Sequence, residues 1–335
     1  MERRNVLSAA AAVAAPWPVG VRAQVRARRI GVLALSADYA RFDEWRAFAD
    51  EMARRGYREG REVEYVHRAP GVQTEPEMSR RLRQSVDDLL RMKIDLLYVV
   101  EGDVAVRGLR AAAPTVPVVV DRFYFDPVER GHVASLARPG GSITGNAVLN
   151  EQTEIKMVEF LLQATGAQAV VGYLDIAHLV SWPMYPRVLQ QRRELGRVLA
   201  FTPVVETLER FDQLGATLDH MRRQGVRAVK FDDPEFFAER RGEVAAAFAA
   251  RRVAAISNEL AYTKAGLLLT FGWDIEDIAR RSAAYVDRIL RGTRPQDLPV
   301  EQVARFKFGV NLATARAIGV QLPTAVIARA DELVS

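Results

Sequence analysis

Short apolar runs alternate with longer amphipathic segments along most of this chain, and this alternation limits the possible folds more than any other feature. Ile30–Leu35 has the composition of a fully buried strand, and Phe42–Arg55 follows it with Trp45, Phe48 and Met52 on one helical face. Strands that lack a polar face need cover on both sides, as in parallel sheets with helices on each face. The sequence therefore predicts a doubly wound α/β architecture.

The alternation occurs twice, on either side of a Gly-rich break. Residues 136–146 contain Pro139 and three glycines, which favours a crossover loop or hinge. We therefore expect two similar parallel-sheet lobes, with further crossings at residues 272–274 and 302–306. The first predicted lobe combines residues 28–145 with residues 270–300. The second combines residues 146–269 with residues 301–335. Because ligands of doubly wound sheets bind beyond the carboxyl ends of the strands, two facing lobes would line one cleft.

The N-terminus has the pattern of a cleavable export signal. Arg3 and Arg4 precede the apolar run Val6–Ala15, and Val21-Arg22-Ala23 provides a cleavage site before Gln24. The apolar run is too short to span a bilayer. The start also resembles a twin-arginine signal with Val6 in place of Phe, so both export routes stay open. The alternative is a disordered, Ala-rich N-terminus of a cytosolic protein.

Composition excludes several kinds of chemistry. The chain has no cysteine, which excludes disulfides, thiolate metal sites, cysteine nucleophiles and a lipid anchor on cysteine. No later apolar stretch is long enough for a membrane span. The formal net charge is +5, but the arginines are scattered beside acidic residues, which favours solvated helix faces over a nucleic-acid surface. The chain also lacks a Walker A motif, a dinucleotide fingerprint after the first strand and a nucleophile elbow.

Three further features have two readings each. The four histidines lie far apart and lack metal-ligand spacing, so we expect surface or packing roles and no metal. The Asp232-Asp233-Pro234 sequence could be a carboxylate pair or a helix N-cap. Gly140-Gly141 could hold a phosphate, but no Lys or helix-starting Ser/Thr follows, so a hinge is favoured. We expect no cofactor and no enzymatic activity.

Several motifs together resemble the tryptophan/tyrosine-type substrate-binding proteins of ABC transporters. The resemblance runs from Arg29 to Asp331, and its most specific parts are Asp126–Gly131, Ser135–Gly145, Tyr285–Gly292, Asp297–Gln302, Asn311–Gly319 and Ala328–Glu332. The early segments Arg29–Leu33 and Gly56–Arg61 agree with it. The chain departs from the family at Tyr173–Asp175, Asn258–Gly266 and Phe271-Gly272. These departures lie where ligand choice would be set.

The resemblance implies a two-lobed periplasmic receptor that closes on one small organic molecule, possible examples being amino acids and related compounds. Its partners would be an ABC permease with its ATPase subunits, and we expect a monomer without stable membrane insertion. Candidate ligand contacts come from the ends of predicted strands. They are Ser36, Glu101, Asp121 and Phe123 in the first lobe, Asp175, Trp182, Asp232 and Asn258 in the second, and Phe271 near a crossing. Phe123 and Trp182 could sandwich a flat group, and the acidic residues suit an ammonium or hydroxyls.

Two other functions are compatible with the same scaffold. One is a ligand-sensing receptor for a signalling partner, which would use the same closing cleft. The other is a sugar- or nucleotide-processing enzyme, which the missing catalytic motifs disfavour.

Overall fold

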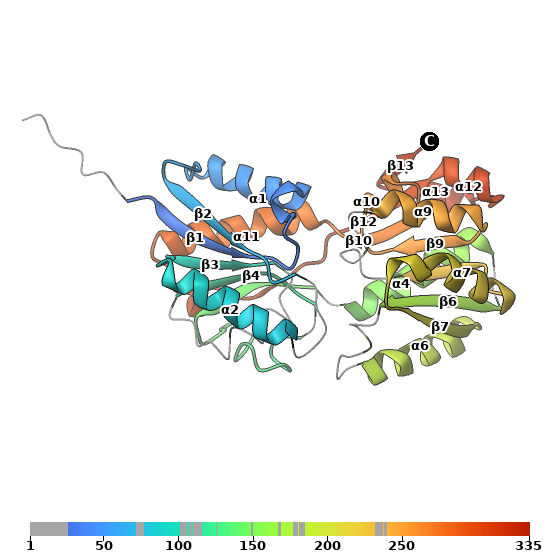
Figure 1. The fold of residues 1–335 in the computed structure, drawn as a ribbon, viewed down its shortest axis with the longest axis horizontal. Helices are drawn as coiled ribbons and strands as arrows, with labels where there is room; N and C mark the ends of the chain where they lie inside the picture. Colours follow the sequence, from blue (N-terminus) through green and yellow to red (C-terminus); the bar gives the residue numbers. More distant parts are fainter. Residues whose placement is uncertain are drawn as a thin grey trace, which may run out of the picture.

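The structure, a computed structural model, consists of two α/β lobes arranged side by side (Figure 1). It describes residues 26–71, 77–100, 106, 109, 116–124, 126–148, 150–166, 169–176, 180, 185–231, 237 and 240–335. The predicted signal, residues 1–23, lies outside these ranges. In the part of the chain that the structure describes, no helix is long and apolar enough to cross a membrane. The predicted architecture of two doubly wound parallel-sheet lobes is confirmed.

The first lobe contains a six-stranded sheet in which every neighbouring pair of strands is parallel. In spatial order the strands are β11 (Glu301–Gln302), β5 (Ile143–Ala147), β4 (Val118–Phe123), β3 (Leu96–Val99), β1 (Arg28–Leu33) and β2 (Val63–Arg68). Helices α1 (Asp43–Arg54) and α11 (Ile275–Leu290) cover one face, and α2 (Glu77–Arg91) covers the other (Figure 1). The central strands β3 and β4 are buried throughout, as their apolar sequences predict.

The second lobe contains a seven-stranded sheet in which only the pairing of β10 with β12 is antiparallel. In spatial order the strands are β13 (Glu332–Val334), β12 (Phe306–Asn311), β10 (Leu269–Trp273), β9 (Ala254–Ser257), β8 (Ala228–Phe231), β6 (Val170–Ile176) and β7 (Thr202–Leu208). Helices α4 (Asn150–Thr165), α6 (Tyr185–Leu199), α12 (Leu312–Ile318) and α13 (Thr324–Ile327) contribute to the core on one face. Helices α7 (Leu214–Arg223), α9 (Arg241–Ala250) and α10 (Ala261–Lys264) contribute to the other.

The Gly-rich segment expected to cross between the lobes instead ends in strand β5 of the first sheet. Gly145 has φ +148°, and a Cβ there would lie 1.9 Å from the carbonyl oxygen of Val120. A glycine is therefore needed where β5 passes against β4, and the chain crosses only after Val148. Sheet membership also assigns residues 270–273 to the second lobe and residues 301–302 to the first.

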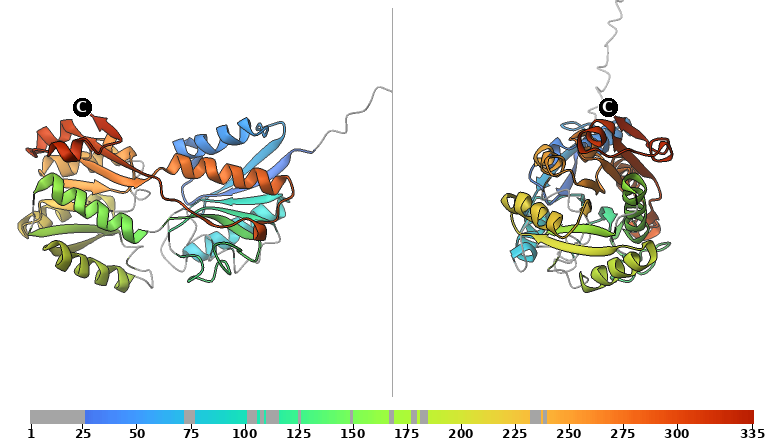
Figure 2. Two further views of the ribbon diagram at one scale, coloured as in Figure 1. Left: turned by 180° about the vertical axis from the view of Figure 1, so that it is seen from behind. Right: turned by 90° about the vertical axis from the view of Figure 1, so that its right-hand side faces the viewer.

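The crossing segments pack against one another in a small apolar cluster. Val148, Trp273 and Val303 lie at the ends of the three crossings, and Ile278 of α11 completes the buried set. Figure 2 shows, from behind, the long segment after α11 that returns to the second lobe. Because the three segments share one cluster, a bend in one is expected to involve the others.

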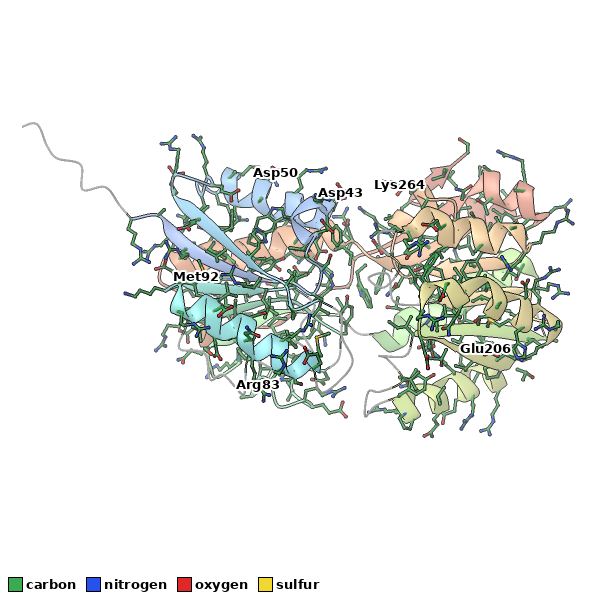
Figure 3. All side chains as sticks on the ribbon, in the orientation of Figure 1. Asp43, Asp50, Arg83, Met92, Glu206 and Lys264 are labelled. Atoms are coloured by element: carbon green, nitrogen blue, oxygen red, sulfur yellow. The ribbon has the colours of Figure 1, made fainter. Side chains whose placement is uncertain are left out.

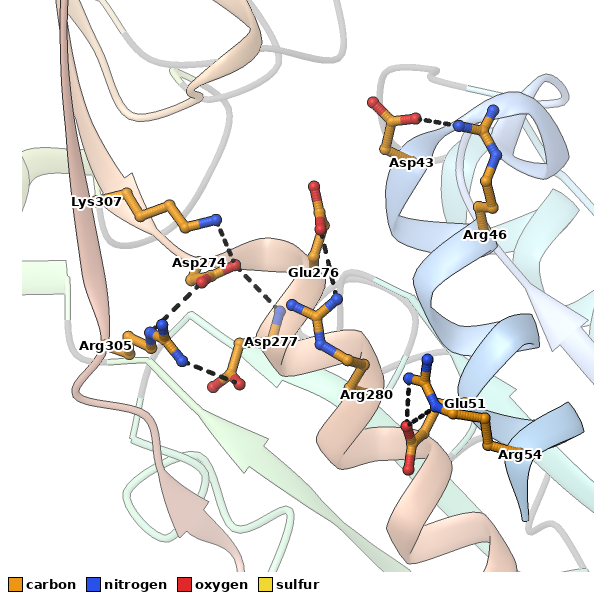
Figure 4. Close-up of polar contacts among 10 residues, drawn as sticks. All are labelled: Asp43, Arg46, Glu51, Arg54, Asp274, Glu276, Asp277, Arg280, Arg305 and Lys307. Carbon is orange, nitrogen blue, oxygen red and sulfur yellow. Dashed lines mark hydrogen bonds and ion pairs between the residues drawn. The ribbon is translucent and has the colours of Figure 1, made fainter. Parts of the chain in front are cut away.

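An ionic group joins two of these crossings (Figure 4). Asp274 precedes α11 and is 3% exposed. Its carboxylate accepts a hydrogen bond from the backbone N–H of Asp277 at 3.2 Å, which caps the helix. The same carboxylate pairs with Lys307 at 3.1 Å and with Arg305 at 3.5 Å on the returning segment. The start of α11 is thereby tied to the start of β12 in the second lobe and to the residue before it.

Candidate binding site

The carboxyl ends of the parallel strands point from each lobe toward the other (Figure 1). We call these two regions the facing edges: the ends of β1 and β4 with the start of α1 in the first lobe, and the ends of β6 and β9 with the starts of α6 and α9 in the second. Figure 3 shows the side chains that both lobes carry toward the space between them. In doubly wound sheets this is the position at which ligands bind.

Asp121 is the centre of a buried hydrogen-bond network at the facing edge of the first lobe. Its Oδ1 accepts bonds from the hydroxyls of Tyr98 at 2.8 Å and Ser282 of α11 at 2.9 Å. Its Oδ2 accepts a bond from Nη1 of Arg122 at 2.5 Å. The Asp121 residue has 0% of its surface exposed. Its carboxylate is therefore satisfied from inside the lobe, as a buried charge requires.

Arg122 extends this network toward α1 and toward the crossings. Nη1 of Arg122 also contacts Oε1 of Glu44 at 2.5 Å, and its Nε donates to the hydroxyl of Tyr124 at 2.9 Å. Burial, with the nearby Asp121 carboxylate as a second cause, raises the pKa of Tyr98 well above its usual value. The raised pKa favours the protonated hydroxyl, which is the form that donates to Asp121. The result is a preorganised edge in which Tyr124 is the partly exposed member.

Asp175 occupies the corresponding position at the end of β6 in the second lobe, and an arginine holds it. Arg192 of α6 binds both carboxylate oxygens of Asp175, with distances of 2.5 and 3.0 Å. The hydroxyl of Tyr185 donates to Oδ2 at 2.7 Å. The guanidinium of Arg192 also lies 4.4 Å from the centre of the Tyr173 ring. Bidentate pairing of this kind fixes the orientation of both side chains.

A second acid and a buried lysine complete the charges of this edge. Glu154 of α4 contacts Nε of Arg192 at 3.3 Å and Nζ of Lys230 at 3.6 Å. Lys230 carries a charge but is only 2% exposed, because it lies in β8, an interior strand of the sheet. Among the described residues, two acidic and two basic side chains therefore meet beneath the facing edge, and each basic group has an acidic partner there.

Eight of the nine sequence-predicted residues fall into three groups. Glu101, Trp182 and Asp232 lie outside the described residues. Asp121, Phe123 and Asp175 lie at the facing edges as expected but are buried, with exposures of 0, 1 and 1%. Ser36 and Asn258 follow β1 and β9 and remain partly exposed. These positions stay predictions as ligand contacts, and the described residues among them do not contact one another across the lobes.

Phe271 is placed differently from the strand-end residues. It lies within β10, where its ring stacks on Phe306 at 5.4 Å and lies 5.1 Å from the ring of Phe160. Its side chain is therefore part of the aromatic packing beneath α4 and beside the crossings. The alternation of strand side chains explains this, because Phe271 lies on the same face as the buried Leu269.

Asn258 lies where a glycine lets the backbone approach closely. A Cβ at Gly272 would be 1.7 Å from the backbone oxygen of Asn258, so no side chain fits there. The Oδ1 atom of Asn258 is buried and accepts no hydrogen bond from the described side chains or backbone. A buried carboxamide oxygen without a donor is unfavourable, and a polar ligand group could supply the missing bond.

Sequence reasoning missed several residues of the facing edges. Tyr124, Tyr185, Arg192 and the buried Lys230 were not among the candidates. Two features of the sequence indicate these networks: Arg122 directly follows Asp121 in an apolar strand, and Lys230 lies within the apolar run of β8. A charge inside a continuous buried strand requires a partner, and it could have pointed to these networks.

Besides the packing at the crossings, two side-chain contacts between described residues link the lobes. Nη1 of Arg187, in the first turn of α6, lies 3.3 Å from Oε1 of Glu129 in the first lobe. The guanidinium carbon of Arg241, at the start of α9, lies 6.0 Å from the centre of the Phe42 ring, which precedes α1. Among the described residues, no group of three or more acidic, histidine or cysteine side chains is placed to bind a metal.

This architecture is that of the type I periplasmic binding proteins, and comparison with solved structures agrees. An ABC domain in complex with L-Trp from Streptococcus pneumoniae matches with TM-score 0.76 and 19% identity, covering 92% of this chain and 100% of that one. A conserved domain protein from Vibrio cholerae matches with TM-score 0.75 and 18% identity, covering 92 and 100%. An ABC transporter solute binding protein from Agrobacterium vitis, bound to α-D-tagatopyranose, has TM-score 0.60 and 14% identity, covering 90 and 99%.

Sequence comparison shows which family the chain resembles. Residues 204–334 match the family model of the ABC transporter substrate binding proteins. No curated protein gives a significant match to the sequence. The family resemblance predicted from the motifs is therefore confirmed, and the matched segment includes Tyr285–Gly292 and Asn311–Gly319.

Proposed function

We propose that this chain is the exported substrate-binding component of an ABC importer. It binds one small organic solute between its facing edges and delivers it to a membrane permease. The observation that carries the proposal is the arrangement of two parallel sheets whose carboxyl ends face each other across three crossings that pack together. The family match and the N-terminal signal pattern support the roles in transport and export.

The physical mechanism is a shift between open and closed lobe arrangements. A solute drives closure only through contacts that are better in the closed state than in the open one. Ser36 and Asn258 are the sequence-predicted residues best suited for direct contact, because both are partly exposed at opposite edges. Tyr124 and Tyr185 join them, each held through its hydroxyl by Arg122 or Asp175. We assign Asp121, Asp175 and Arg192 to positioning these side chains.

The chemistry of the site favours a polar or zwitterionic organic solute. Asn258 offers an acceptor, Ser36 offers a hydroxyl, and the two tyrosines combine an aromatic ring with a polar end. The acids nearest the edges already bind arginine, so they leave little free charge for a bare cation. Solutes such as L-tryptophan and D-tagatose, which the similar proteins bind, belong in the first screen together with other amino acids and small carboxylates.

A thermal-shift screen of the purified protein, followed by calorimetry on each hit, tests the proposal. A solute at 100 times its Kd stabilises the folded state by about 2.7 kcal/mol, which is easily detected. We expect one solute per chain and a decrease in the radius of gyration on binding, measured by small-angle X-ray scattering. Chemical conversion of the bound compound at enzymatic rates would contradict a receptor role.

Matched variants test the residue assignment. Replacing Asn258 by alanine removes the buried acceptor and is expected to weaken solute binding about tenfold, equivalent to about 1.4 kcal/mol. The control is Gln321→Ala, which shortens an exposed side chain in the loop after α12. An unchanged Kd in Asn258→Ala would remove this residue from the site without affecting the transport assignment.

A further inference from the structure

We propose that two side-chain contacts between the lobes, away from the crossings, are clasps that stabilise the closed arrangement and make lobe closure sensitive to ionic strength. The first clasp is Glu129 with Arg187, and the second is Phe42 with Arg241. The inference rests on the proposed function, since closure matters only for a protein that captures a solute between its lobes. It assigns part of the closure energy to side chains away from the strand ends.

The first clasp is an exposed ion pair between segments far apart in sequence. Glu129 lies in the turn after β4, and Arg187 lies at the start of α6. Their side chains are 62 and 56% exposed. Interactions between exposed charges are weak and are screened by salt. The Debye length of the solution falls from ~10 Å at 0.1 M salt to ~3 Å at 1 M. This clasp therefore supplies the salt dependence.

The second clasp places a guanidinium between aromatic rings of different lobes. Arg241 forms an ion pair with Glu259 and lies 5.7 Å from the ring centre of Tyr262, both in the second lobe. Its other contact is the Phe42 ring of the first lobe, at 6.0 Å. The second-lobe contacts hold the guanidinium in position whether or not Phe42 is near. Only the contact with Phe42 depends on the lobe arrangement.

Opening the lobes breaks both clasps and leaves the networks inside each lobe intact. The lost contacts therefore belong to the open–closed equilibrium, which can be shifted only by interactions that differ between its states. Each clasp is expected to raise the closed-to-open ratio about two- to fivefold. In both clasps the second lobe provides an arginine. The first lobe provides the carboxylate of Glu129 in one clasp and the ring of Phe42 in the other.

Fluorescence energy transfer between dyes on the two lobes measures the closed fraction without any solute. Because the chain has no cysteine, Asp50→Cys on α1 and Val198→Cys on α6 give two unique labelling positions. Both side chains are exposed, Val198 at 79%. In the protein with native clasps, we expect the closed fraction to fall as NaCl is raised from about 20 mM to about 1 M, the range over which screening becomes strong.

Variants assign the effect to the first clasp. Glu129→Gln and Arg187→Gln should each lower the closed-to-open ratio about two- to fivefold at low salt and flatten the salt dependence. Combining Glu129→Arg with Arg187→Glu should restore both. Arg210→Gln is the matched control, because Arg210 forms an exposed ion pair with Asp212 inside the second lobe. Equal energy transfer in all variants and at all salt concentrations would overturn the first clasp.

Phe42→Leu tests the second clasp, because leucine keeps the apolar bulk and removes the ring face. We expect the closed-to-open ratio to fall about two- to fivefold at both low and high salt, while Phe42→Tyr leaves it unchanged. Equal closed fractions in Phe42→Leu and the native protein would overturn this clasp. Failure to find any solute would instead contradict the proposed function, since these measurements use none.

Discussion

Asp121 and Asp175 lie at similar places in the two lobes, near the carboxyl end of a buried parallel strand, but they are neutralised differently. Asp121 receives two hydrogen bonds from neutral hydroxyls and one from the neighbouring Arg122. Asp175 depends on a bidentate arginine from α6, with one tyrosine hydroxyl beside it. A carboxylate at the end of a buried strand can therefore hold neighbouring side chains in place instead of binding a ligand.

The largest effect is expected from Asp175→Ala. The substitution leaves the guanidinium of Arg192, which is 4% exposed, without its bidentate partner, although Glu154 still contacts its Nε. Removing one member of a buried pair costs roughly 3–5 kcal/mol of unfolding free energy. Urea denaturation measures the loss. Asp212→Ala, at an exposed pair, is the control and is expected to change stability by less than about 1 kcal/mol.

Asp121→Asn is expected to have a smaller effect, about 1–3 kcal/mol. The carboxamide keeps one acceptor for Tyr98 and Ser282, and Glu44 remains to balance the charge of Arg122. Urea denaturation of Asp121→Asn beside Asp175→Asn makes the comparison isosteric. If the first-lobe substitution proves as costly as the second-lobe one, the proposed difference between the two networks is wrong.

Single hydroxyl deletions around Asp121 should each cost about 1 kcal/mol of unfolding free energy. Ser282→Ala removes the bond from α11, and Tyr98→Phe removes the bond from β3. The double variant should cost more than the sum of the two, because it leaves Oδ1 of Asp121 without either donor. Additive costs, measured in a double-mutant cycle by urea denaturation, would show that the two bonds act independently.

The smallest effect is a pH dependence in the second lobe. Burial and the hydrogen bond to Asp175 raise the pKa of Tyr185 to about 12, from an unfolded value near 10. A raised acid pKa favours the neutral form in the folded state. The associated stability is complete below pH ~10 and is lost as the pH rises toward ~12.

Thermal unfolding measured at intervals from pH 8 to about pH 11 checks this effect. The Tm of the native protein should fall more steeply above pH ~10 than the Tm of Tyr185→Phe. The two curves would be parallel if Tyr185 titrated normally in the folded state. Since Tyr185 is partly exposed, we expect a modest difference in slope.

Much of the fold follows from local sequence, and the exceptions have physical causes. The apolar runs that became β1, β3, β4, β6 and β9 lack a polar face, so their burial between helices could be predicted. Strand β5 overlaps the stretch that the sequence predicts as a crossover, because residues 136–146 contain Pro139 and three glycines, one of them Gly145 of β5. The glycine is required by the approach of Val120, a neighbour that the local sequence does not reveal.

The sequence by itself determined the two-lobed doubly wound architecture, the resemblance to the substrate-binding proteins of ABC transporters and the absence of cysteine chemistry. It also indicated the strand ends as the place for a site, because parallel strands always bring their carboxyl ends to one edge. Only the tertiary structure decided which strand-end residues are satisfied internally. Asp121 and Asp175 are acidic in the sequence, but their partners Ser282 and Arg192 lie 161 and 17 residues away. Whether a carboxylate faces a donor or the space between the lobes depends on these distant contacts, which exist only after folding.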